Sequence, residues 1–194
     1  MLRWINNLRY SQIMKKNSSS EIDKDLNNLP DHLAGLIKES LETKSLSKKL
    51  SAREILVKMG KKIIPQIHKL LSSENDSLRM EAAKIIELIA DRRSIPLLII
   101  LLDDPLFDIR WLAAEGLVKI GRRSICPLLK SLRDGRSSLF FNRGTHHILL
   151  GLVDENEKNK LMPLLQSLDN YHELVETAPV QASIALKNVF KCNT

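Results

Sequence analysis

Two adjacent histidines, His146 and His147, are the residues of this sequence whose type best suits catalysis. Histidine changes its charge near neutral pH and is therefore the usual general acid or base in enzymes. That role needs an orienting carboxylate together with a nucleophile or a metal. No recognisable spacing supplies them, since the sequence has no His-x-x-x-His pair, no cysteine cluster and no glycine-rich phosphate loop. We therefore predict no catalytic residue, no metal and no cofactor, and interpret both histidines as half-buried.

Basic residues recur in pairs at three places and could bind an anion. The six residues are Lys61, Lys62, Arg92, Arg93, Arg122 and Arg123. Each pair follows an expected helix, where a cation stabilises the helix dipole by about 0.3–1 kcal/mol. The alternative is an anion-binding edge for nucleic acid or an acidic protein. The local role is favoured, because no stacking aromatic residues interleave with these charges and Asp91 interrupts them.

An internal repeat predicts the elements that would position these side chains. Pro65, Pro96 and Pro127 recur at a spacing of 31, and Ala83 and Ala114 recur at the same spacing. A fixed period between about 20 and 50 residues indicates a solenoid. In each period one helix is expected after the proline and a second helix after a polar turn, so the chain should stack helix pairs.

The second helix of each pair carries one apolar face. The predicted core positions are Leu78, Ala82, Ile86 and Ile89 in one copy, and Ile109, Ala113, Leu117 and Ile120 in the next. This spacing follows the period of an α-helix. The small alanine at the centre of each face lets a neighbouring helix approach closely.

Composition supports an all-α protein. Aromatic residues make up only 4% of the 194 residues, and the apolar mass is mostly Leu, Ile and Ala, which suit contacts between helices. The net charge of +7 permits acidic partners without requiring them. Cys126 and Cys192 have no metal-ligand or disulfide-framework spacing, so we expect two free thiols in a reducing, cytoplasmic setting.

The segment "DDPLFDIRWLAAEGLVKIG", Asp103 to Gly121, resembles a HEAT repeat of the variety also found in phycobilisome-lyase-like proteins. The segment "NDSLRMEAAKIIELIADRRSIPLL" is a second good copy, and the resemblance covers roughly residues 47–168. It implies that Arg79 and Arg110 brace their turns, the latter through Asp104, and that the second helix of each pair lines a concave face.

The predicted fold is therefore an all-α, right-handed α-solenoid of about four HEAT-like helix pairs with terminal capping helices. We expect one domain over residues 21–194, preceded at residues 1–20 by a flexible or amphipathic arm. That arm could make weak contact with a membrane surface. The longest apolar run, Ile95 to Leu102, is too short to span a membrane.

The period of 31 also predicts which side chains face the concave groove. Trp111 falls in one column with Met80 and Asn142, and His146 falls in the column of Glu115, whereas His147 aligns with Gly116 and should pack near a neighbouring helix. The predicted groove residues are Met80, Lys84, Trp111, Leu112, Glu115, Asn142, Arg143 and His146.

The favoured function is a non-enzymatic interaction module, a scaffold or adaptor that binds an extended or helical protein segment in this groove. One alternative is an enzyme or auxiliary factor resembling the chromophore lyases, with Arg143, His146 or Glu115 assisting thioether chemistry. The other alternative is a nucleic-acid binder that uses the basic edge.

Overall fold

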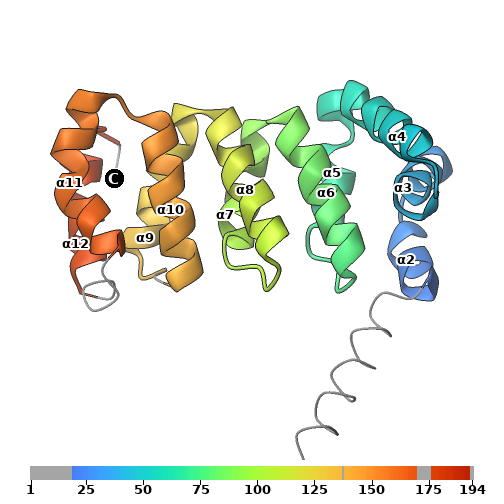
Figure 1. Cartoon of the computed structure of the whole chain (residues 1–194), viewed down its shortest axis with the longest axis horizontal. Coiled ribbons are helices and arrows are strands. Elements are labelled where there is room, and N and C mark those ends of the chain that lie inside the picture. Colours follow the sequence, from blue (N-terminus) through green and yellow to red (C-terminus); the bar gives the residue numbers. More distant parts are fainter. Residues whose placement is uncertain (1–18, 137, 170–175, 193–194) are drawn as a thin grey trace, which may run out of the picture. The chain divides into compact units, whose positions relative to one another are not determined.

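The computed structural model describes residues 19–136, 138–169 and 176–192. Throughout these ranges the chain forms eleven α-helices and three short 3₁₀ helices, with no strand (Figure 1). The predicted all-α fold class is confirmed, and the arrangement is consistent with a HEAT-type α-solenoid. None of the helices in the described ranges is long and apolar enough to cross a membrane.

The chain divides into two compact units, Met1–Ile89 and Ala90–Thr194. One domain over residues 21–194 stays a prediction. The predicted arm at residues 1–20 lies almost wholly outside the described residues, and α2 begins at Ser19.

The N-terminal unit is built on helix α6. Its elements are α2 (Ser19–Leu26), α3 (Asp31–Glu42), α4 (Leu46–Met59), η1 (Gly60–Lys62), α5 (Ile64–Leu70) and α6 (Asp76–Ile89). Helix α6 packs against α3, α4 and α5, and α3 packs against α4. Arg53 of α4 donates from Nε and Nη2 to the two carboxylate oxygens of Glu81, each at 2.7 Å. Because Glu81 is buried, this bidentate pair ties α4 to α6.

The C-terminal unit contains three helix pairs. Its elements are η2 (Arg92–Ser94), α7 (Ile95–Leu101), α8 (Phe107–Ile120), η3 (Arg122–Ser124), α9 (Ile125–Arg133), α10 (Leu139–Leu152), α11 (Glu155–Asp169) and α12 (Thr177–Asn188). Helices α8 and α10 lie side by side, with α7 and α9 behind them (Figure 1). Helix α12 packs against both α9 and α11 and closes this unit.

The predicted helix faces are the ones that become buried. Leu78 and Ile86 in α6, and Ile109, Ala113 and Leu117 in α8, are at 0% exposure. The last residue of each predicted face, Ile89 in α6 and Ile120 in α8, lies at the helix end and is half-buried. Gly60 and Gly121 end α4 and α8 with φ angles of 59° and 86°, a left-handed backbone that favours glycine.

The fourth copy has a different register from the predicted one. Asp76 and Phe107, which begin α6 and α8, are 31 positions apart, but Leu139, which begins α10, follows Phe107 by 32. Five residues separate α9 from α10, as they separate α7 from α8, so the extra residue lies in α9, which is longer than α7. Every side chain of α10 is therefore displaced by one position, and Phe141, not Phe140, takes the core place of Ile109, at 0% exposure.

The expectation of two free thiols is wrong, because Cys126 and Cys192 form a disulfide. Cys126 lies in the first turn of α9, and Cys192 follows α12, which packs on α9. The Cα atoms are 6.0 Å apart although the residues are separated by 66 positions. Tertiary packing of the last helix creates this pair, so sequence spacing does not reveal it. The cytoplasmic location stays a prediction.

We expect Cys192→Ala to lower the free energy of unfolding. A disulfide that closes a loop of this length removes about 4 kcal/mol of loop entropy from the unfolded chain, and measured effects are usually about 2–4 kcal/mol. Urea unfolding followed by circular dichroism measures the change. Dithiothreitol should destabilise the wild type by a similar amount and leave Cys192→Ala unaffected. A wild type that is equally stable in both buffers would contradict the pairing.

Candidate functional site

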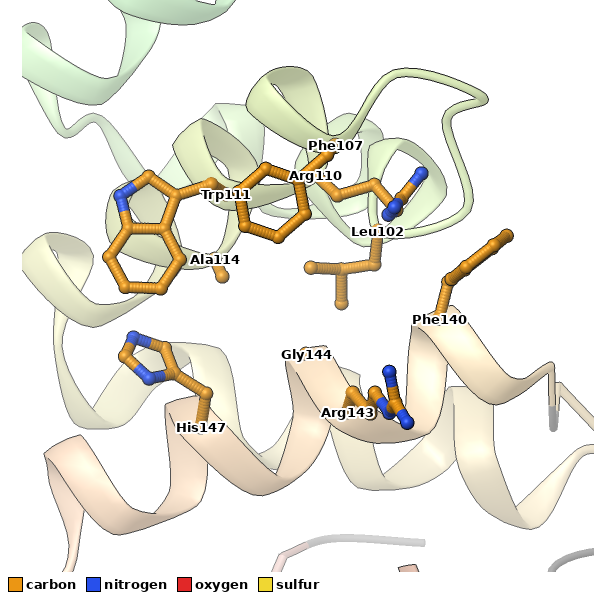
Figure 2. Close-up of a pocket in the computed structure, with 9 residues that line it drawn as sticks. All are labelled: Leu102, Phe107, Arg110, Trp111, Ala114, Phe140, Arg143, Gly144 and His147. Carbon is orange, nitrogen blue, oxygen red and sulfur yellow. The ribbon is translucent and has the colours of Figure 1, made fainter. Parts of the chain in front are cut away.

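An open pocket of about 200 Å³ lies on the C-terminal unit, between α8 and α10. Figure 2 shows the side chains of α8 along one wall and those of α10 along the other. The lining residues are Leu102, Phe107, Arg110, Trp111, Ala114, Phe140, Arg143, Gly144 and His147. Two of these, Trp111 and Arg143, belong to the predicted groove, and the lining contains no carboxylate.

Three exposed aromatic residues line the pocket. Phe107, Trp111 and Phe140 are 65%, 48% and 45% exposed, although the chain has few aromatic residues. The ring centroids of Trp111 and Phe107 are 6.5 Å apart, and those of Trp111 and His147 are 4.9 Å apart. Trp111 therefore sits between two rings, and its indole stays open to solvent.

Arg110 links the turn before α8 to the aromatic rings. Its Nη1 donates to the carbonyl oxygens of Asp104 and Pro105 at 2.7 and 3.0 Å. Its guanidinium carbon lies 3.9 Å from the ring centroid of Phe140 and 5.7 Å from that of Phe107, within cation–π range. Asp104 therefore meets Arg110 through its backbone carbonyl, and the Asp104 carboxylate accepts from the amide of Leu106.

Arg79 occupies the corresponding position before α6. Its Nη1 donates to the carbonyl oxygens of Ser73 and Glu74, and its Nη2 donates to the carboxylate of Asp76 at 2.7 Å. Both arginines thus hold the loop that precedes their own helix.

The floor of the pocket depends on a glycine. A Cβ atom on Gly144 would lie 2.9 Å from Cδ2 of Leu102, which is closer than Cβ atoms come to such neighbours in real structures. Leu102 is fully buried at the end of α7. The missing side chain at Gly144 therefore lets α10 approach Leu102, directly after α7, and leaves open space beside Trp111.

The start of α10 is held by its preceding turn. The Ser138 hydroxyl accepts from the amide of Phe141 at 3.1 Å and caps the helix. The same hydroxyl donates to the carboxylate of Asp103, which also accepts from Arg136 at 3.1 Å. Asp103 lies in the turn between α7 and α8, so these bonds fix where α10 begins relative to α8.

The two histidines exchange their predicted roles. His147 lines the pocket, and its Nε2 lies 2.7 Å from the carboxylate of Glu115. His146 instead faces α11, where its Nε2 is 3.4 Å from Asp169. The one-residue displacement of α10 causes the exchange, and it gives His147 the orienting carboxylate that sequence spacing did not reveal. The described residues contain no group of three His, Cys, Asp or Glu side chains that could hold a metal.

The placement of Asn142 in the groove is also wrong. Because of the displacement, Asn142 in α10 corresponds to Arg110 in α8, and the side chain of Asn142 is fully buried. Arg143, not Asn142, is the counterpart of Trp111. Leu112 is half-buried on α8 and is not among the pocket-lining residues.

Met80 and Lys84 line a second pocket, on the N-terminal unit. This pocket has a volume of about 170 Å³, and the Arg53–Glu81 pair forms part of its wall. Lys49 contributes a further cation. The second pocket is polar and has no aromatic lining, unlike the pocket at Trp111.

The six cations of the predicted basic edge are exposed and lie in the 3₁₀ helices η1, η2 and η3. Two of them hold local carboxylates. Arg93 donates to Asp91 at 2.9 Å, and Arg122 donates to Glu157 at 2.8 Å. The hydrogen bond from Arg122 lowers the pKa of Glu157 below its ordinary value, although burial opposes the shift. These two pairs reduce the charge available to an external anion.

Sequence reasoning missed Phe107, Phe140 and Gly144 as site residues. Phe107 and Phe140 sit in the first turns of α8 and α10, where the helical-face pattern gives no reason to expect a pocket. The available signal was their rarity, because the chain has only four phenylalanines.

Residues 64–140 match the HEAT-repeat family. The matched stretch runs from the start of α5 into α10 and includes the α8 wall of the pocket. The match supports a HEAT-repeat protein, a class in which repeats commonly mediate protein interactions. No curated protein matches the chain.

Paired glycine substitutions test the close approach at the pocket floor. Gly35 lies inside α3 with no atom within 4 Å of an added Cβ, so Gly35→Ala should raise the free energy of unfolding by about 0.5–1 kcal/mol. Gly144→Ala makes the same helix-favouring change in α10 but pushes on buried Leu102, and should lower it by about 1 kcal/mol. Urea unfolding of both variants measures the difference. Equal stabilisation of the two would show that α10 does not approach Leu102.

Proposed function

We propose that the protein is a non-enzymatic interaction module, a scaffold or adaptor that binds an extended or helical protein segment at the pocket of the C-terminal unit. The observation that carries this proposal is the half-exposed Trp111, set among the exposed rings of Phe107 and Phe140 and beside two arginines. Tryptophan and arginine are the residue types most often found at binding hot spots.

Physical chemistry supports a binding role for these rings. The exposed surface of these rings is not needed to fill the core, since Ile109, Leu117 and Phe141 already fill the cores of α8 and α10. An exposed apolar patch with a polar rim is typical of a protein-interaction site. The partner would bury the rings, and the arginines would set its orientation.

Met80 and Lys84 form a separate contact site in this proposal. They line the polar pocket of the N-terminal unit together with Lys49 and Arg53. The aromatic pocket should supply most of the affinity, because buried aromatic residues dominate interface energetics.

The alternative of a phycobilisome-lyase-like enzyme is favoured by one observation, the Glu115–His147 pair at 2.7 Å. A carboxylate that orients a histidine is a common acid–base arrangement. The pocket lining, however, supplies no serine, cysteine, lysine or carboxylate as a second reacting group. Affinity discriminates the two functions: His147→Phe keeps a ring against Trp111, so an interaction module should bind its partner within about threefold of the wild type.

The nucleic-acid alternative has weaker support, because Asp91 and Glu157 hold two of the edge arginines. Replacing Arg92, Arg93, Arg122 and Arg123 with Gln should change partner affinity by less than about tenfold. Fluorescence anisotropy with a bound peptide and with a labelled oligonucleotide measures both affinities. The nucleic-acid function would be favoured if the wild type bound the oligonucleotide tightly and with a steep salt dependence, and if the four-arginine variant lost this binding.

Selection from a random 12-residue peptide library displayed on phage tests the proposed function. The wild type should enrich peptides whose affinity falls by about 2 kcal/mol, roughly thirtyfold, in Trp111→Ala. Calorimetry with synthetic copies of the enriched peptides measures the loss, and circular dichroism shows whether the fold is retained.

The matched control is Ile100→Ala. Ile100 is 52% exposed on α7, similar to Trp111, but does not line the pocket. Ile100→Ala should bind the peptides as the wild type does. Enriched peptides that tolerate Trp111→Ala, or a library that yields no binder, would contradict the proposed function.

A further inference from the structure

We propose that the segment bound at this pocket is acidic and apolar: it places one large aliphatic or aromatic side chain against Trp111 and one carboxylate, from Asp or Glu, against Arg143 and Arg110. This inference rests on the proposed function and specifies the chemistry of its partner. Figure 2 shows the two ends of the pocket, with Trp111 and His147 facing each other at one end and Arg110, Phe140 and Arg143 at the other.

The basic end has two cations and no carboxylate in its lining. The side chain of Arg143 has no hydrogen bond or ion pair with any other residue in the described part of the chain. Arg110 uses Nη1 on two backbone carbonyls, which carry no net charge to neutralise it. The pocket therefore holds an uncompensated positive charge, and a carboxylate is the complementary group that guanidinium binds best.

Three carboxylates on the neighbouring elements are already engaged. Asp103 accepts from Ser138 and Arg136 in the turn before α10. Glu115 is paired with His147 at the aromatic end. Asp104 accepts from the amide of Leu106 and lies buried in the loop before α8. Because no carboxylate lines the pocket either, Arg143 is available to a carboxylate from a partner.

The aromatic rings do not prepare the pocket for a cationic partner. A cage of Phe and Trp rings is the usual receptor for an organic cation. Here the ring of Phe140 is already covered by Arg110, whose guanidinium carbon lies 3.9 Å from its centroid. A lysine or arginine from a partner would meet an occupied ring and two like charges, so a basic segment should be rejected.

The apolar end suits a large side chain without charge. Trp111 and His147 enclose it, and the small residues Ala114 and Gly144 leave space at the floor. Leu102 closes the floor from below and is fully buried. An aliphatic or aromatic side chain would cover the exposed indole. The contact is favourable because it removes apolar surface of both groups from water.

A charge-swap experiment tests this inference. The probes are two synthetic 12-residue peptides: an acidic–apolar peptide enriched from the phage library, and the same peptide with each Asp and Glu replaced by Lys. We expect Arg143→Glu to weaken the acidic peptide by about tenfold or more and to strengthen the lysine peptide by a similar factor. Calorimetry at two salt concentrations gives the affinities, and recovery by the lysine peptide shows that the variant is folded.

Arg123→Glu is the matched control. It makes the same change in net charge on an exposed arginine of η3 that does not line the pocket. It should alter either affinity by less than about threefold, because Arg123 does not line the pocket and salt screens the interactions of exposed charges. An equal effect of Arg123→Glu and Arg143→Glu would overturn the inference in favour of a general charge effect.

The composition of the enriched peptides separates this inference from the function on which it rests. Basic or uncharged peptides that need Trp111 would overturn the acidic partner and leave the interaction module standing. The absence of any peptide that needs Trp111 would overturn both.

Discussion

The close approach of α10 to the end of α7, where Gly144 faces Leu102, is the contact on which the pocket depends. A Cβ atom at position 144 would lie 2.9 Å from Cδ2 of Leu102, so the buried Leu102 side chain or α10 would have to shift. The approach brings the ring centroids of His147 and Trp111 to 4.9 Å from each other and places the ring of Phe140 against the Arg110 guanidinium. The Ser138 cap and the Asp103 hydrogen bonds hold α10 at the matching axial position. One missing side chain thus permits the two walls to meet around open space.

The pocket forms where the repeat becomes irregular. Regular copies bury the same stripe, as Leu78 in α6 and Ile109 in α8 show. The single extra residue before α10 keeps this stripe, now with Phe141 in the core, while it moves Arg143 and His147 to positions opposite α8. A regular fourth copy would have placed Asn142 and His146 there. The distinctive chemistry of this chain therefore comes from a local change in register, and the stable framework around it comes from repetition.

The fold was predictable from the sequence because stacking repeats dictate a periodic pattern. The recurrent prolines and alanines marked the helix pairs, and the apolar spacing identified the buried faces of α6 and α8. The site was only partly predictable. Trp111 and Arg143 were expected in the groove, but a single inserted residue reversed the roles of His146 and His147 and hid the Glu115–His147 pair. The Cys126–Cys192 bond depends on how α12 packs on α9, which no local pattern encodes.

The most direct measurement is the response of the Trp111 indole N–H signal in a two-dimensional ¹H–¹⁵N spectrum when an enriched peptide is added. The signal is assigned by its loss in Trp111→Phe, which distinguishes it from the other tryptophan, Trp4. A partner seated at the pocket should shift this signal strongly, together with the amides of Arg143 and His147. Unchanged signals from these three residues, with shifts at Lys49 and Lys84 instead, would contradict the account.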